Sequence, residues 1–235
     1  MKILYAGDIH GSVAAAIQLD NIAFMHDIRI IVQCGDFAMH WNGYEVRERD
    51  SLWRYFEQRE SPAFWYTCGG NHENWTDWLQ LAESEPSPYV RLAQRCYYIK
   101  RGSHVNIGGI RHTFLGGAES TDRQWRTPYI SWWPEETPSY KEFVSFSDSL
   151  NTHKPQVVVT HDAPLRVALD REDREKSTTP RTLEQIVATS EHKPRYWMLG
   201  HHHELSETTI EDTTYFCTGV NGQYIILDFP TQEIE

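Results

Sequence analysis

The 235-residue sequence contains no apolar run long enough to cross a membrane. A transmembrane helix needs about 20 consecutive apolar residues, and charged residues interrupt every apolar stretch well before that length. The first residues also lack the basic segment and the long apolar stretch of a secretory signal. We therefore expect a cytoplasmic protein that does not contact the membrane.

Cysteine and basic residues are scarce as well. The 22 Lys and Arg residues are outnumbered by 33 Asp and Glu, which gives a formal net charge of −11. Because nucleic acids are bound mainly through Lys and Arg, this balance argues against a general nucleic-acid-binding surface, although a local basic groove stays possible on these grounds. Four widely spaced cysteines without a C-x-x-C pair are expected to be buried free thiols: Cys34, Cys68, Cys96 and Cys217.

The remaining composition is that of a globular protein, with 40% hydrophobic and 13% aromatic residues. The length fits one compact domain over residues 1–235. Twelve histidines are many for this length, and several lie beside Gly or Asp, a pattern that favours metal binding. Five of them have no predicted partner and are placed at the surface: His26, His104, His112, His153 and His192.

Short apolar runs alternate with helical segments in the first third of the chain. We predict strands at 2–6, 28–34 and 62–68, and helices at 12–25, 44–58 and 73–82, with Ser12 as an N-cap. This alternation indicates βαβ units around a largely parallel sheet.

The pattern then changes to short runs with glycine breaks over 89–115, which predicts antiparallel hairpins and the start of a second sheet. Residues 118–138 give no clear prediction, and 170–179 is expected to be a loop or a frayed helix. The other predicted elements are helices at 140–150 and 183–190, strands at 156–160 and 195–199, and three short strands at the end of the chain.

Polar side chains follow five of the predicted strands. Ligands bind beyond the carboxyl ends of such strands, so distant segments can deliver side chains to one place. Each group alone is weak support, because Gly-Asp is an ordinary turn and a lone histidine is usually a surface or core residue. Together they supply the carboxylate, amide and imidazole groups that a pair of divalent cations about 3.5–4 Å apart would need. The groups are Asp8 with His10, Asp36, Asn71 with His72, His161, and His201 with His203.

Five sequence segments carry these residues in a fixed order between residues 7 and 203. They read Gly7-Asp8-Ile9-His10-Gly11, Gly35-Asp36, Gly70-Asn71-His72-Glu73, His161 after a valine-rich strand, and Gly200-His201-His202-His203. In this order and at this spacing they resemble the signature motifs of the calcineurin-like metallophosphoesterases. The resemblance implies an α/β fold, a four-layer α/β/β/α sandwich of two mixed sheets, with a dinuclear centre where the strand ends meet.

The resemblance also implies which residues hold two divalent ions, with manganese expected first and iron, zinc or nickel as alternatives. Asp8, His10 and His203 would bind the first ion, Asn71, His161 and His201 the second, and Asp36 would bridge them. His202 is left out of this set, because it points away from its neighbours in an extended segment. His72 would act beside the ions on the leaving oxygen, with either Glu73 or Asp36 as its acidic partner.

These ligands predict a mechanism. A water shared by two divalent cations loses a proton near neutral pH and can attack phosphorus in line, while the cations and Asn71 hold the phosphoryl group. A histidine with a pKa near 6.5, His72, would then protonate the leaving oxygen. Catalysis is thus expected to depend on Asp36 and His72.

The sequence departs from the protein Ser/Thr phosphatases after Asp36, where an arginine that grips phosphate would be expected. The chain continues instead as Phe37-Ala38-Met39-His40-Trp41. Arg123 and Arg126 are candidate substitutes that would bind the substrate phosphate. His40-Trp41 and Trp132-Trp133 are candidates for an aromatic wall against a nucleobase, although large aromatic side chains serve packing more often.

The function predicted from these residues is hydrolysis of a phosphomonoester or phosphodiester in a small or nucleotide-like substrate. A nuclease of the same family is the alternative, and it would need an exposed groove of basic side chains near the metals. A non-catalytic scaffold with the same fold is a further alternative, but such a protein would be expected to lack ligands that are all present here.

Overall fold

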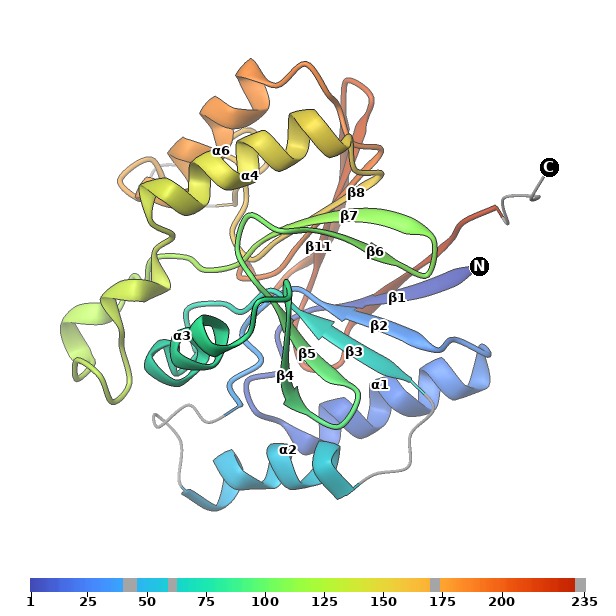
Figure 1. The fold of residues 1–235 in the computed structure, drawn as a ribbon, viewed down its shortest axis with the longest axis vertical. Coiled ribbons are helices and arrows are strands. Elements are labelled where there is room, and N and C mark those ends of the chain that lie inside the picture. The colour runs from blue at the N-terminus through green and yellow to red at the C-terminus, as the bar shows by residue number, and fades with distance from the viewer. Residues whose placement is uncertain (40–45, 59–62, 170–173, 231–235) are drawn as a thin grey trace.

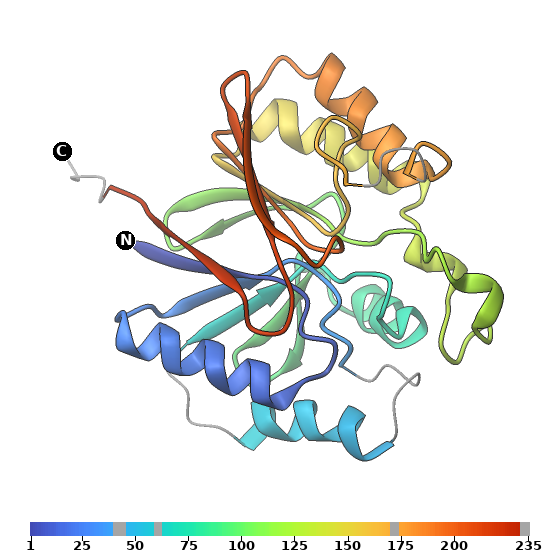
Figure 2. The ribbon, with the colours of Figure 1, turned by 180° about the vertical axis from the view of Figure 1, so that it is seen from behind.

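Two six-stranded sheets pack face to face in the computed structural model, which describes residues 1–39, 46–58, 63–169 and 174–230. Helices cover the outer face of each sheet, as Figures 1 and 2 show. The expected four-layer α/β/β/α sandwich of two mixed sheets is therefore confirmed. Among the described residues, no helix combines the length and the apolar character needed to cross a bilayer.

The first sheet has the strand order β12-β1-β2-β3-β5-β4. Strands β1, β2, β3 and β5 are parallel, and β12 and β4 join its two edges in antiparallel orientation. Helices α1, α2 and α3 lie on its outer side (Figure 1). The bounds are β1 Lys2–Ala6, β2 Ile30–Gln33, β3 Phe64–Thr67, β4 Tyr89–Ala93, β5 Cys96–Ile99, β12 Tyr224–Asp228, α1 Val13–Met25, α2 Val46–Gln58 and α3 Trp75–Ser84.

The second sheet has the order β10-β11-β9-β8-β7-β6. Strands β7, β8, β9 and β11 are parallel, with β6 and β10 antiparallel at the edges. Helices α4 and α6 cover its outer face (Figure 1). The bounds are β6 His104–Ile107, β7 Ile110–Leu115, β8 Val157–Thr160, β9 Tyr196–Leu199, β10 Leu205–Ile210, β11 Thr213–Thr218, α4 Tyr140–His153 and α6 Thr178–Thr189.

The central strands are apolar on both faces because each face packs against a different layer. In β1, Leu4 and Ala6 contact the helices of the first sheet, whereas Ile3 and Tyr5 point into the space between the sheets. Strand β8 divides in the same way, since Val157 and Val159 face the other sheet and Val158 faces its helices. Successive side chains of a strand point to opposite faces, so a continuous apolar run, and not an alternating one, is what a doubly covered strand requires.

Several expectations about elements are met, and others need correction. Ser12 does cap α1, accepting a hydrogen bond from the Ala15 amide at 3.2 Å, and all four cysteines are buried free thiols. The second sheet begins at β6 and not at residue 89, because β4 and β5 extend the first sheet. His112 was placed at the surface, but its side chain is fully buried between the sheets.

The segment without a clear prediction, residues 118–138, forms two short 3-10 turns, η1 at Arg123–Trp125 and η2 at Pro134–Glu136. Helix α6 begins at Thr178, five residues before the predicted start. The Glu119 carboxylate accepts hydrogen bonds from the amides of Thr178 and Thr179 at 2.8 and 3.2 Å. A helix start leaves such amides without a partner, and here the partner comes from a distant loop, which local sequence patterns do not reveal.

Candidate metal centre

The carboxyl ends of five parallel strands meet at one edge of the two sheets. Asp8 follows β1, Asp36 follows β2 and Asn71 follows β3, all in the first sheet. His161 comes directly after β8, and His201 and His203 follow β9, in the second sheet. The sandwich therefore brings together residues that are up to 195 positions apart in sequence.

The backbone at this edge adopts a strained conformation at several of the candidate ligands. Four of the non-glycine residues with positive φ lie here, namely His10, Asp36, His201 and His203, with φ between 47° and 66°. This left-handed region is costly for residues with a side chain beyond glycine, and such residues concentrate at functional sites. Asp36 is held in place by its 2.8 Å hydrogen bond from the His72 amide.

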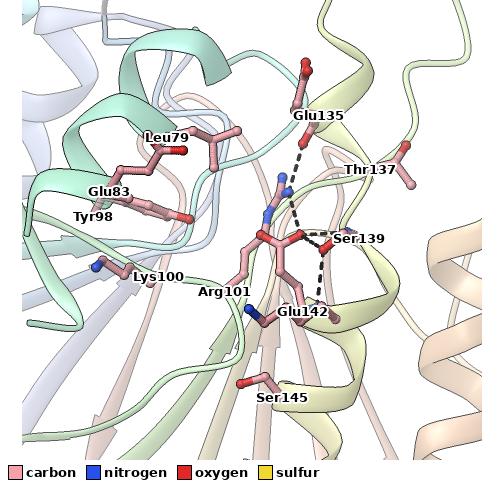
Figure 3. Close-up of a pocket in the computed structure, with 12 residues that line it drawn as sticks. Leu79, Glu83, Tyr98, Lys100, Arg101, Glu135, Thr137, Ser139, Glu142 and Ser145 are labelled. Carbon is pink, nitrogen blue, oxygen red and sulfur yellow. Dashed lines mark hydrogen bonds and ion pairs between the residues drawn. The ribbon is translucent and has the colours of Figure 1, made fainter. Parts of the chain in front are cut away.

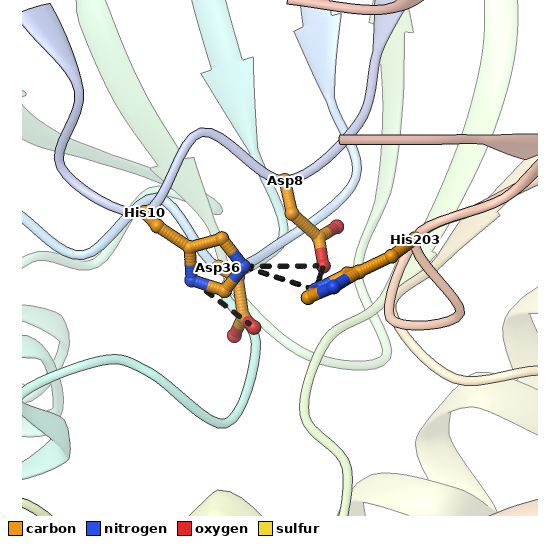
Figure 4. A group of neighbouring side chains, drawn as sticks. All are labelled: Asp8, His10, Asp36 and His203. Atoms are coloured by element: carbon orange, nitrogen blue, oxygen red, sulfur yellow. Dashed lines mark hydrogen bonds and ion pairs between the residues drawn. The ribbon is translucent and has the colours of Figure 1, made fainter. Parts of the chain in front are cut away.

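The first group of candidate ligand atoms belongs to Asp8, His10, Asp36 and His203 (Figure 4). These atoms all lie within 4.8 Å of one another. The Asp8 carboxylate is 3.1 Å from His203 Nε2 and 3.8 Å from His10 Nε2, and His10 Nδ1 is 3.9 Å from Asp36. His10 Nε2 and His203 Nε2 approach to 3.0 Å. Four side chains thus bring a candidate ligand atom each into one small region.

The second group consists of Asp36, His161 and His201, whose atoms also lie within 4.8 Å of one another. His161 Nε2 is 3.3 Å from Asp36 Oδ1 and 3.1 Å from Asn71 Oδ1. Asp36 belongs to both groups, which is the geometry that a bridging carboxylate requires. The structure therefore divides the predicted ligands into the same two sets as the resemblance does, although metal binding by them stays a prediction.

His161 shows most clearly what these sites accommodate. Its Nδ1 donates to the carbonyl oxygen of Cys34 at 2.8 Å, so Nε2 faces the oxygens of Asp36 and Asn71. Burial lowers the pKa of His161, but the Asp36 and Asp8 carboxylates and the Cys34 carbonyl together outweigh burial and raise the pKa to about 10. Positive charge is therefore favoured between these atoms. A histidine whose other nitrogen is bonded to a carbonyl is the usual arrangement of a metal ligand, and a divalent cation fits this donor set.

The two carboxylates are completely enclosed, with exposed fractions of 0% for Asp8 and 1% for Asp36. Burial raises the pKa of Asp8, and His203 offsets this only in part. Burial would also raise the pKa of Asp36, but His161, His72 and His10 hold it well below its usual range. Buried carboxylates are costly without a compensating cation, so the donor set and its electrostatics both suit two divalent ions.

Two glycines leave room for these side chains. A Cβ on Gly70 would lie 2.2 Å from Asp36 Oδ1, and a Cβ on Gly200 would lie 2.4 Å from Asp8 Oδ1. No real Cβ approaches another heavy atom this closely. Any larger residue at either position would therefore displace a carboxylate from the candidate metal centre.

His72 lies beside the first group, not in it. Its Nε2 is 4.0 Å from Asp36 and receives a hydrogen bond from the Arg126 guanidinium at 2.9 Å. Burial and the Arg126 charge lower the pKa of His72 to about 4, although Asp36 opposes this. The expected pKa near 6.5 is therefore not found in this arrangement. Arg126 thus contacts the residue beside the centre, and its binding of substrate stays a prediction.

Glu73 is not the acidic partner of His72. Its carboxylate is fully buried and accepts hydrogen bonds from the amides of Phe37, Ala38 and Gly70 at 2.7–3.1 Å. It thus ties the loop after β2 to the loop after β3. Of the two acids left open by the sequence, Asp36 is the one near His72.

Comparison with known proteins identifies the family of this chain. A family model described as calcineurin-like phosphoesterase matches residues 1–205. The chain belongs to the calcineurin-like phosphoesterase family. A search of curated protein sequences finds no match.

Solved structures with the same fold have little sequence in common with this phosphoesterase-family chain. A Thermus thermophilus protein, TT1561, is 15% identical, with a TM-score of 0.65 over 97% of this chain and 93% of that one. GAP50, the anchor in the inner membrane complex of Plasmodium, is 12% identical, with a TM-score of 0.57 over 93% and 71% of the two chains. A putative 5′-nucleotidase from Staphylococcus aureus is 14% identical, with a TM-score of 0.56 over 99% and 51%. At these identities the likeness concerns the fold alone.

Sequence reasoning missed one arginine at the centre of this family member. Arg174 donates to His201 Nε2 at 2.5 Å and lies 3.9 Å from the buried carboxylate of Asp162. It belongs to the charged stretch 170–179, where nothing in the sequence distinguishes it from its neighbours. His202 is not in the predicted ligand set; its Nε2 lies 3.7 Å from the Asp162 carboxylate, and it belongs to neither group of candidate ligand atoms in the described residues.

A chain of hydrogen bonds supports Asn71 from behind. Asn71 Nδ2 donates to Ser120 Oγ at 3.2 Å, and Ser120 donates through Oγ and its amide to the Glu136 carboxylate at 2.7 and 2.6 Å. Trp132 Nε1 also donates to Glu136, at 2.9 Å. Because the Asn71 amide nitrogen is occupied in this way, its oxygen is the atom left to face His161.

Of the four residues predicted to form an aromatic wall, the structure describes Trp132 and Trp133. Trp132 anchors Glu136, and Trp133 is buried and donates to Thr76 Oγ1 at 2.9 Å. Both side chains therefore hold their loop in place, the role that packing statistics favour. His40 and Trp41 lie outside the described residues.

Two cavities flank the loop that carries Glu136. One, of about 560 Å³, lies between α3 and α4 and contains none of the candidate ligands (Figure 3). Arg101 forms part of its wall and donates to the carbonyl oxygens of Glu135 and Glu136 at 2.8 and 3.0 Å. The other, of about 510 Å³, is lined by Arg123. In the described part of the chain, Arg123 has no hydrogen bond or ion pair to a candidate ligand or to His72, unlike Arg126.

Proposed function

We propose that this family member is a metal-dependent phosphoesterase that hydrolyses a phosphomonoester or phosphodiester of a small or nucleotide-like molecule. The observation that carries the proposal is the pair of ligand groups that share Asp36 and lie beside His72 and Arg126. A histidine and an arginine next to a candidate dinuclear centre are the groups that phosphoester hydrolysis needs in addition to the ions.

Two divalent cations, manganese or else iron, zinc or nickel, would be held by the residues of the two groups. When bound, such cations neutralise phosphoryl oxygens and lower the pKa of water. Asp36 would be shared between them, because among the described residues only its carboxylate belongs to both groups. Asp8, His10 and His203 would complete one site, and Asn71, His161 and His201 the other.

The chain's own side chains would orient the substrate and move a proton. A phosphoryl oxygen is a stronger acceptor than an imidazole nitrogen for the guanidinium of Arg126. On substrate binding, Arg126 would therefore turn from His72 Nε2 to the phosphoryl group. His72 Nε2, still close to Asp36, would then be available to carry the proton that the leaving oxygen takes up.

The first test measures phosphate-ester hydrolysis directly. Purified protein would be supplied with each candidate metal and assayed on para-nitrophenyl phosphate, on its bis ester and on single-stranded DNA. We expect turnover of at least one small ester and none of the DNA. Turnover of DNA would support the nuclease alternative, and no turnover with any metal would support a non-catalytic scaffold.

The second test separates ligand from proton carrier. His72→Ala should retain both metals in elemental analysis and lose about 10²- to 10⁴-fold in kcat, the usual contribution of general acid–base catalysis. Asp36→Asn should lose metal, because it removes the shared ligand. His26→Ala, an exposed histidine far from the centre, is the matched control. Undiminished turnover in His72→Ala would remove that residue from the mechanism.

A further inference from the structure

The cavity of about 510 Å³ is formed by two segments that also reach the candidate metal centre. Its volume lies within the range of small-molecule sites, about 300–1,000 Å³. Its wall is made by the loop after β7 and by the residues that lead into α6. The lining residues are Glu119, Ser120, Thr121, Arg123, Thr137, Lys176, Ser177 and Thr178.

Both segments place this cavity next to one half of the centre. On one side, Ser120 accepts the hydrogen bond from Asn71 Nδ2 at 3.2 Å. On the other side, Arg174, two residues before Lys176, donates to His201 Nε2 at 2.5 Å. Asn71 and His201 belong to the same predicted metal site. The cavity therefore lies close to the place where a phosphoryl group would bind, with Ser120 shared between its wall and the support of Asn71.

The cavity wall is positively charged and rich in hydroxyl groups, in a chain whose formal net charge is −11. Its one carboxylate, Glu119, is engaged by the amides of Thr178 and Thr179. In the part of the chain that the structure describes, the Arg123 guanidinium has no carboxylate within ion-pair distance. Guanidinium, ammonium and hydroxyl donors together are the groups that recognise a phosphate.

We infer that this cavity binds a second phosphoryl group, so that the preferred substrate carries one phosphate at the metal centre and another at Arg123 and Lys176. This inference rests on the proposed phosphoesterase activity and narrows its substrate class to bisphosphorylated molecules. Arg123 is thus a substrate-binding residue, as the sequence suggested, but for the remote end of the substrate and not for the phosphate that reacts.

The kinetic test compares matched substrates. Alkanediol bisphosphates of increasing length and alkyl monophosphates of the same length would be assayed for phosphate release. We expect kcat/KM to be about tenfold higher for the bisphosphate of the best length, since a charge-assisted contact contributes on this scale. Arg123→Ala and Lys176→Ala should each remove most of this preference, whereas Arg123→Lys should retain it. Lys141 lies in the wall of the other cavity, so Lys141→Ala should leave the preference intact.

A binding measurement separates failure of this inference from failure of the proposed activity. Non-hydrolysable alkane bisphosphonates and monophosphonates would be titrated calorimetrically into the metal-loaded protein and its Arg123→Ala variant. If monophosphates are hydrolysed but no bisphosphate preference appears in rate or binding, the activity stands and the cavity has no such role. If the bisphosphonate binds more tightly through Arg123 but no ester is hydrolysed, the cavity assignment stands and the activity does not. Thermal unfolding of each variant verifies that it is folded.

Discussion

Two buried histidines, His112 and His161, have the same kind of partner at Nδ1 and different partners at Nε2. In each, Nδ1 lies 2.8–2.9 Å from a backbone carbonyl oxygen, to which it donates. Nε2 of His112 accepts a hydrogen bond from the Tyr5 hydroxyl at 2.8 Å, whereas Nε2 of His161 faces the Asp36 carboxylate. Burial lowers the pKa of His112 to about 4, whereas for His161 burial is outweighed by the Asp36 and Asp8 carboxylates and the Cys34 carbonyl, which together raise the pKa to about 10. Nearby carboxylates therefore decide whether a buried imidazole is neutral or suited to a cation.

His112 gives a prediction about stability and pH. Its pKa in the folded protein lies below the ordinary value near 6.5 that applies when unfolded, so the unfolded chain binds more protons between these values. The free energy of unfolding should therefore fall as pH decreases from about 6.5 toward 4, by on the order of 3 kcal/mol from this group. Urea unfolding at a series of pH values measures it.

The control for this prediction is His112→Gln, which cannot titrate in this range. The variant is expected to be less stable near neutral pH, but its stability should fall less steeply with acid than that of the unaltered chain. The difference between the two slopes isolates His112 from the other titrating groups. Parallel curves would show that His112 is not held neutral by its buried site.

At the scale of elements, the loop from β7 to α4 orients a candidate metal ligand. Ser120 and Glu136 fix the Asn71 amide so that its oxygen faces His161. Glu136→Gln would replace one carboxylate oxygen by an amide nitrogen, which donates to Ser120 Oγ. The Ser120 hydroxyl would then be free to donate to Asn71, which favours a flipped amide whose nitrogen, unable to bind a cation, faces the centre.

Glu136→Gln should consequently weaken metal binding at the Asn71 site by about 10- to 100-fold, the usual effect of losing a residue that supports a ligand. Ser120→Ala should act in the same direction. Titration of metal-depleted protein against a competing chelator measures both sites separately. Glu135→Gln is the matched control, because the Glu135 carboxylate does not contact Ser120. Equal affinities in Glu136→Gln and Glu135→Gln would show that this network does not position Asn71.

Local sequence predicts elements where a pattern is complete within the segment. Strand β1 was predicted at its observed bounds, and α1 begins at Val13 after the predicted Ser12 cap. Helix α6 was predicted too short, because residues 170–179 were expected to be a loop or a frayed helix and the helix was expected to begin only at residue 183. In fact Pro180 is tolerated in the first turn, and the amides before it are capped by Glu119 from another segment. The sequence of the segment alone does not contain this contact, because Glu119 is about 60 residues away.

The candidate metal centre also contains residues that local sequence predicts and residues that depend on contacts between distant segments. Asp8, Asp36 and Asn71 could be predicted because each follows an apolar strand in a recognisable order, and the fold then determines that they converge. Arg174 could not, because its role depends on a contact with His201 that no spacing in the sequence encodes. The loop from β7 to α4 resisted prediction for a related reason, since it is held by Trp133 on Thr76 and by Arg101 on two backbone carbonyls.

At the scale of the whole molecule, the candidate metal centre links the two sheets. Asp8, Asp36 and Asn71 come from the first sheet, whereas His161, His201 and His203 come from the second. Ions bound between them would connect both layers, and they would bind the folded chain far more tightly than the unfolded one. Metal binding should therefore stabilise the entire sandwich, not only the loops at its edge.

Metal removal tests this coupling. With free Mn²⁺ at one hundred times its dissociation constant, the folded state gains about 2.7 kcal/mol per site, which corresponds to a rise in Tm of roughly 5–10 °C for a chain of this size. Thermal unfolding of chelator-treated protein, with and without added Mn²⁺, Zn²⁺ or Ni²⁺, measures the shift. Asp36→Asn should abolish most of it, because its side chain is the only one in both ligand groups of the described residues. If none of the ions raises the Tm of the unaltered chain, these side chains do not hold metal in the folded protein.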